Sequence, residues 1–328
     1  MLTHGHIRKV LLALFVLTYA SAAEDTNDSS SLPTYRSIVS EVRVTFFATD
    51  ENNHPVASLT KSDVAVVDSE FVIRNFRSFT PADETSLDVV ALVDLSESVA
   101  PRLQVAMSAV LQLVAREQSI ADDNIAVLSF GGTFEGTPGG GVGSIHPAIF
   151  CSSGCRAAGA TNRPLTVKNS GATPLFDALL FGADFLSHHR RTGARPVLIL
   201  FSDGKDTISM HSAREALDAV LSDGALVYSV DTGTSGHPSS KQKAGSMFLR
   251  QVSDATGGRY FSLLRFSPND GADNVLDAVL EDLRASYVVT YDLPSHQAGF
   301  HSLCLMPTHN LNFTFHSRNG YYYEPSVR

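Results

Sequence analysis

Residues 87–98 read Leu-Asp-Val-Val-Ala-Leu-Val-Asp-Leu-Ser-Glu-Ser, and this stretch decides the fold. Its first seven residues form an almost continuous apolar run, which is typical of a strand that is buried on both faces of a parallel sheet. The polar run that follows, from Asp94 to Ser98, marks the point at which the strand ends and the chain turns toward a helix. Asp and Ser also serve as ordinary helix caps at such turns, so this run by itself establishes no function.

Predicted strands and helices alternate along the chain from Leu87 onward. Such alternation favours a mostly parallel sheet with helices on both faces, so we predict a doubly wound, Rossmann-like α/β domain. The predicted strands are residues 87–94, 125–130, 196–202, 225–230 and 259–262, and the predicted helices are residues 101–118, 174–188, 212–222, 243–256 and 273–285.

Short extended segments flank this region on both sides, in residues 35–82 and residues 287–328. Each segment contains runs of β-branched and aromatic residues that are separated by polar turn residues, which is the pattern of short strands. The step Asn319-Gly320 near the end of the chain is a tight-turn signal. We expect the two segments to pair with each other and to form one smaller β domain from opposite ends of the chain.

The first 23 residues have the layout of a secretory signal peptide. Arg8 and Lys9 precede an apolar run at residues 10–17, and small residues at 20–22 offer a cleavage site. The apolar run is too short to span a bilayer, so we expect no membrane span after cleavage and a secreted, periplasmic or extracellular protein, with an uncleaved anchor as the minor alternative. The polar residues 24–34 are expected to form a flexible leader.

Composition excludes some classes of function and leaves others open. The net charge of −9 and the lack of a basic stripe argue against a nucleic-acid partner. Residues 131–170 are rich in Gly, Ser and Pro, and they form either a functional loop or a disordered insertion, with a possible strand at residues 164–167. Cys151 and Cys155 in this segment either pair in a local disulfide or stay free, because spacing alone does not fix the pairing.

Five oxygen-bearing side chains stand at the ends of predicted strands or the start of a predicted helix. Asp94, Ser96 and Ser98 follow the first strand, Thr173 precedes a helix, and Asp203 lies in a Ser-Asp-Gly turn after another strand. Ligands of open parallel sheets gather outside the carboxyl ends of the strands, so these side chains are expected to converge. Oxygen donors are the ligands that hard cations such as Mg²⁺ prefer.

This set of residues resembles the metal-ion-dependent adhesion site of von Willebrand factor type A domains, over roughly residues 86–286. The resemblance implies that Ser96, Ser98 and Thr173 contact a divalent cation directly, while Asp94 and Asp203 hold it through water. Mg²⁺ is the expected ion, with Mn²⁺ or Ca²⁺ as possible substitutes. The remaining coordination position is then expected to accept an exposed Asp or Glu of a protein partner.

The resemblance therefore implies a secreted, noncatalytic protein-binding or adhesion module, and the flanking β segments are similar to those of secreted bacterial proteins related to type A domains. Two alternatives stay open, namely a metal-assisted hydrolase and a scaffold whose metal only stabilises loops. The chain has no Gly-x-Ser-x-Gly nucleophile motif and no phosphate-binding Gly-rich loop with a Lys, which argues against common enzyme classes. Asp177 is expected either to orient Thr173 or a metal-bound water, or simply to stabilise the start of its helix.

Overall fold

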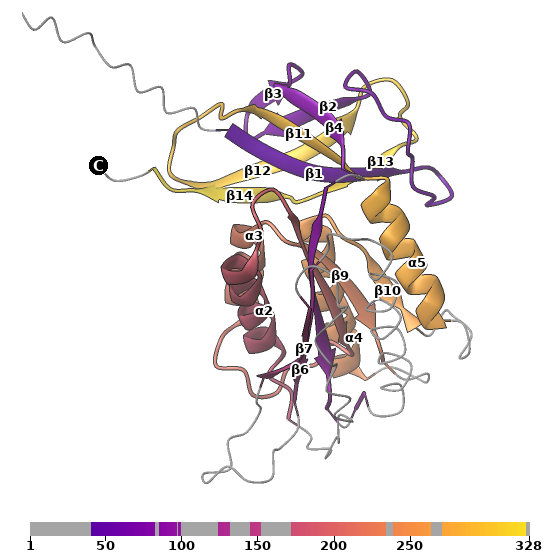
Figure 1. Ribbon diagram of the computed structural model, residues 1–328, viewed down its shortest axis with the longest axis vertical. Coiled ribbons are helices and arrows are strands. Elements are labelled where there is room, and N and C mark those ends of the chain that lie inside the picture. Colours follow the sequence, from indigo (N-terminus) through magenta and orange to yellow (C-terminus); the bar gives the residue numbers. More distant parts are fainter. Residues whose placement is uncertain are drawn as a thin grey trace, which may run out of the picture. The chain divides into compact units, whose positions relative to one another are not determined.

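The computed structural model describes residues 41–82, 85–96, 98–99, 124–131, 145–151, 172–233, 239–263 and 271–325 (Figure 1), with the backbone alone at 145–151 and 271–273. These residues belong to one compact unit, Val39–Arg328. The predicted signal peptide and leader, the helix at residues 101–118, the strand at residues 164–167 and Cys155 lie outside the described residues.

A six-stranded sheet forms the centre of the α/β part, in the order β10-β9-β8-β5-β6-β7. Five of its strands are parallel, and β7 pairs with β6 in the antiparallel sense. All described side chains of β5 and β6 are buried, which explains why the sequence of β5 shows a continuous apolar run rather than an alternating one. The strands are β5 (Leu87–Asp94), β6 (Asn124–Phe130), β7 (Ile145–Cys151), β8 (Arg195–Ser202), β9 (Leu226–Asp231) and β10 (Tyr260–Ser262).

Helices cover both faces of this sheet (Figure 1). Val89, Ala91 and Val93 of β5 pack in one apolar cluster with side chains of α5 (Gly271–Arg284). Val90 and Leu92 point to the opposite face, where they pack with side chains of three other helices. These are α2 (Leu175–His189), α3 (Ala213–Asp223) and α4 (Ser240–Thr256). The prediction of a doubly wound, mostly parallel α/β fold is therefore confirmed.

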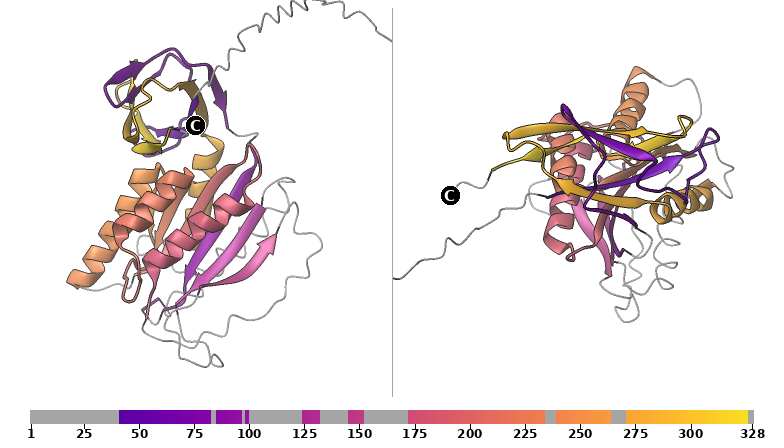
Figure 2. Two further views of the ribbon diagram at one scale, coloured as in Figure 1. Left: turned by 90° about the vertical axis from the view of Figure 1, so that its left-hand side faces the viewer. Right: turned by 90° about the horizontal axis from the view of Figure 1, so that it is seen from above.

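The terminal segments form two four-stranded antiparallel sheets around a shared apolar core, which Figure 2 shows nearly end-on in its left view. In one sheet the N-terminal β1 pairs with both β11 and β13, and in the other β2 pairs with β12. The expected β domain, built from both ends of the chain, is thus confirmed. The first sheet contains β13 (Thr314–Ser317), β1 (Glu41–Thr49), β11 (Tyr287–Asp292) and β4 (Ser78–Pro81), and the second contains β14 (Gly320–Tyr323), β12 (Gly299–Pro307), β2 (Val64–Asp68) and β3 (Phe71–Ile73).

One strand differs from the sequence prediction. Strand β7 lies in residues 131–170, where the sequence predicts a functional loop or a disordered insertion. Pro147 obscured the β7 pattern, but an edge strand tolerates its missing N–H group. Asn319-Gly320 does not close a hairpin, because β13 pairs with β1 whereas β14 pairs with β12, so this step carries the chain from one sheet to the other.

Two further features concern the chain's surroundings. Within the described ranges, no helix combines the length and the apolar character that crossing a membrane would require. Cys304 lies on β12 as an exposed free thiol.

Candidate metal centre

Asp94 is the last residue of β5, and its side chain is completely buried. Its Oδ1 accepts a hydrogen bond of 2.8 Å from the backbone N–H of Ser96, and its Oδ2 accepts one of 2.6 Å from the Ser202 hydroxyl. The bond to Ser96 turns the chain sharply after the strand, as Asp side chains commonly do. As a result the Oγ atoms of Ser96 and Ser98 lie 3.3 Å apart.

Thr173 precedes α2, and its side chain is 2% exposed. Its backbone N–H donates to Thr207 Oγ1 over 2.7 Å, and its carbonyl accepts from the backbone N–H of Thr207 over 2.9 Å. These bonds tie the start of α2 to the loop that follows β8. That loop also contains Asp203, whose side chain is 1% exposed.

Gly131 directly follows β6 and brings the end of that strand close to Asp94 and Ser96. It has a φ of +87°, and a Cβ atom there would lie 3.3 Å from Ser96 N, 3.5 Å from the Ala172 carbonyl oxygen and 3.6 Å from Asp94 Oδ1. A residue with a side chain would therefore be strained in its backbone and tightly packed against the backbone nitrogen of Ser96. The ends of β5 and β6 and the approach to α2 meet at this glycine.

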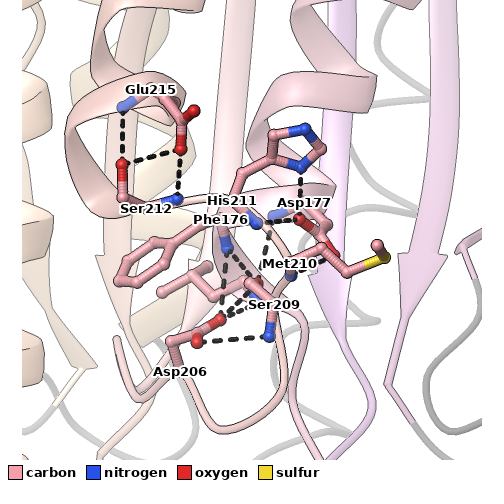
Figure 3. A network of polar contacts seen from close by, with 9 residues as sticks. Phe176, Asp177, Asp206, Ser209, Met210, His211, Ser212 and Glu215 are labelled. Carbon is pink, nitrogen blue, oxygen red and sulfur yellow. Dashed lines mark hydrogen bonds and ion pairs between the residues drawn. The ribbon is translucent and has the colours of Figure 1, made fainter.

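The loop after β8 holds the first turn of α2 from outside the helix (Figure 3). Asp206 Oδ1 accepts from the backbone N–H of Leu175 over 2.9 Å, because Pro174 at the N-cap position supplies no side-chain cap. Asp177 Oδ2 in turn accepts from Met210 N over 3.0 Å, and its Oδ1 accepts from His211 N over 3.1 Å. Partial burial acts to raise the pKa of Asp177, but these hydrogen bonds outweigh it and hold that pKa below its usual value. The contacts of Asp177 thus fix this loop.

A comparison of the sequence with family models shows the family to which this chain belongs. A family model described as von Willebrand factor type A domain matches residues 88–268, more than half of the 328 residues. The chain belongs to this family. A search among curated proteins found no match.

Several solved structures are similar to this type A domain protein. One is an aerotolerance-related membrane protein from Bacteroides fragilis, with 15% identity and a TM-score of 0.41, covering 60% of this chain and 98% of that chain. Another is proximal thread matrix protein 1 from the mussel byssus with a zinc-occupied MIDAS motif, at 16% identity and a TM-score of 0.46, covering 66% of this chain and 50% of that one. A third is the pilus adhesin SpaC from Lactobacillus rhamnosus GG, at 11% identity and a TM-score of 0.47, covering 84% of this chain and 47% of that one. The chain thus spans about half the length of the latter two proteins.

The electrostatics of the type A domain's loops favour a bound cation. Burial raises the pKa of Asp94 to about 6, although hydrogen bonds from Ser202 and Ser96 oppose this, and the nearby charge of Asp203 adds to the increase. Asp203 Oδ2 lies 2.6 Å from Lys205 Nζ. The two buried carboxylates, Asp94 and Asp203, therefore share one ammonium group as their positive charge. Taking carboxylates out of water is costly unless positive charge compensates them, and these three groups leave one negative charge uncompensated.

The donor set also fits a hard divalent cation. Three hydroxyls and two carboxylates supply oxygen atoms alone, the ligand type that Mg²⁺, Mn²⁺ and Ca²⁺ prefer. In the part of the chain that the structure describes, no group of three or more His, Cys, Asp or Glu side chains could hold a metal, so an ion bound here would need the hydroxyls as ligands. The sequence prediction missed the roles of Ser202, Asp206 and Thr207, which orient these loops through contacts that no local motif reveals.

Proposed function

We propose that this type A domain binds one divalent cation and presents it to a carboxylate of a protein partner. In this proposal Ser96, Ser98 and Thr173 contact the ion directly, and Asp94 and Asp203 hold it through water. The observation that carries the proposal is the burial of two carboxylates beside neutral hydroxyls at the carboxyl edge of the sheet. Mg²⁺ is the favoured ion, and Mn²⁺ or Ca²⁺ are the substitutes.

The hydroxyl donors explain why such an ion would attract an acidic partner. Neutral ligands leave most of the cation's charge in place, whereas directly bound carboxylates would cancel it. The carboxylate oxygens of Asp94 are already engaged by Ser96 N and Ser202 Oγ, and those of Asp203 are engaged by Lys205. This engagement supports a water-mediated role for both carboxylates.

A noncatalytic role fits the acids around the site better than hydrolysis does. A metal-assisted hydrolase needs a general base beside the reacting water. Among the described residues, Asp206 accepts from the start of α2, and Asp177 accepts from the loop at Met210 and His211. Both carboxylates are therefore already engaged in hydrogen bonds with backbone N–H groups. We further propose that residues 1–23 direct export and that the β domain supports the exposed type A domain outside the cytoplasm.

Paired peptides test the proposed function. Immobilised peptides carrying a single Asp or Glu are compared with matched peptides carrying Asn or Gln, and binding of the purified protein is measured in Mg²⁺ and in EDTA. We expect some acidic peptides to bind in Mg²⁺ alone, with loss of binding in their amide counterparts and in Asp203→Ala. Binding that ignores both EDTA and the amide exchange would refute the proposal.

Two other outcomes identify the alternatives. Hydrolysis of phosphoester or peptide substrates that disappears in Asp203→Ala would establish a metal-assisted hydrolase instead. A metal that raises the melting temperature of the wild-type protein without any acid-dependent binding would establish a scaffold in which the ion only stabilises loops.

A further inference from the structure

Lys205 contacts both carboxylate oxygens of Asp203. Its Nζ lies 2.6 Å from Oδ2, and its backbone N–H donates to Oδ1 over 3.2 Å. The Lys205 side chain is 28% exposed, whereas that of Asp203 is 1% exposed. An ammonium group that can reach solvent thus sits directly on a carboxylate that cannot.

The backbone of this turn is held in place, so the side chain is the part that can move. Gly204 has a φ of +75°, and a Cβ atom there would lie 2.3 Å from the carbonyl oxygen of Gly245 in α4. Such a close approach of two backbones leaves no room for the turn to shift toward α4. The long, flexible stem of Lys205 can rotate toward solvent without any change in the backbone.

We propose that Lys205 is a built-in competitor of the divalent cation, and that it leaves the loaded site with a net positive charge. This inference rests on the proposed function of the same site. Asp94, Asp203 and Lys205 together carry one negative charge, so a divalent cation brings the site to +1. Without the lysine the same ion would only neutralise the two carboxylates.

Lys205 therefore has opposite effects on the two ligands. It weakens the binding of the cation by repulsion and by occupying Asp203, and it strengthens the attraction of the loaded site for an anionic side chain. Removal of one unit charge at this partly buried position is expected to change the Mg²⁺ affinity by about ten-fold. The change should be largest at low ionic strength, because salt screens charges that reach solvent.

Calorimetric titration of MgCl₂ into four proteins tests the inference. These are the wild type, Lys205→Met, Lys205→Arg and the control Lys243→Met, which removes an exposed lysine from α4. We expect Lys205→Met to bind Mg²⁺ about ten-fold more tightly. Lys205→Arg and Lys243→Met are expected to stay within about two-fold of the wild type, since one keeps the charge and the other removes an exposed charge that salt screens.

Metal-free unfolding provides a second readout that does not involve the ion. Lys205→Met is expected to melt below the wild type in EDTA, because Asp203 loses its counter-ion, whereas Lys243→Met melts unchanged. Wild-type binding of Mg²⁺ with unchanged or weaker binding by Lys205→Met would overturn this inference alone. Absence of Mg²⁺ binding in all four proteins would overturn the proposed function and this inference with it.

Discussion

Replacement of Gly245 by alanine is predicted to destabilise the protein, although alanine is the better helix former. A Cβ atom at position 245 in α4 would lie 2.6 Å from the Asp203 carbonyl oxygen and 2.8 Å from the Gly204 carbonyl carbon. Helix propensity alone favours alanine over glycine by about 1 kcal/mol. Overpacking costs about 1–3 kcal/mol, and the upper end applies because backbone atoms cannot rotate away as a side chain would. The net expectation is a loss on the order of 2 kcal/mol.

Chemical denaturation of Gly245→Ala measures this loss as a fall in the free energy of unfolding. Met247→Ala is the matched control, because Met247 lies on the same helix and is 69% exposed. The control is expected to stay within about 0.5 kcal/mol of the wild type. Gly245→Ala should also bind Mg²⁺ more weakly, since the displaced atoms belong to Asp203 and Gly204. A Gly245→Ala protein at least as stable as the wild type would refute the predicted contact between α4 and the turn.

Asp206→Ala is expected to lower the free energy of unfolding by about 1–2 kcal/mol, because the first turn of α2 loses its only acceptor for Leu175 N among the described contacts. An unchanged denaturation midpoint would contradict this. Burial, aided by the charge of Arg259, lowers the pKa of His316 to about 4 from 6.5. The unfolded chain therefore binds more protons between those values, so stability present above pH 6.5 is lost as the pH falls toward 4, by roughly 3 kcal/mol in total. The difference in unfolding free energy between the wild type and His316→Gln should shrink over this interval, and a difference that is constant with pH would refute the assignment.

The sheet and the site loops were predictable because short stretches of the sequence contain the signals for both. Apolar runs indicate buried strands, and oxygen-bearing side chains directly follow them. The strand that ends at Asp94 has a nearly continuous apolar run, which is typical of a strand covered on both faces. The oxygen donors directly follow this run. The same logic located Thr173 and Asp203 at the edge where the strands end. Their roles as ligands stay a prediction.

Contacts between distant segments could not be predicted. The acceptor for the first turn of α2 comes from Asp206, 31 positions after Leu175, and no capping pattern near Pro174 indicates it. The step Asn319-Gly320 is a tight-turn signal in the sequence, but the sequence does not show that the strands on either side of it, β13 and β14, belong to different sheets. Pro147 obscured the strand pattern of β7 in the sequence. A proline is tolerated there because β7 lies at the edge of the sheet.

Titration of Mg²⁺ into the wild type, Thr173→Val and Thr232→Val tests the central claim most directly. Both threonines are buried, and valine removes only the hydroxyl, while the Thr207 contacts of position 173 use its backbone. Thr232 is the matched control because its hydroxyl has no hydrogen-bond partner among the described residues. Single-site binding in the wild type and in Thr232→Val, with binding at least about ten-fold weaker in Thr173→Val, is the predicted result. Equal Mg²⁺ affinity in Thr173→Val and the wild type would contradict the proposed cation site.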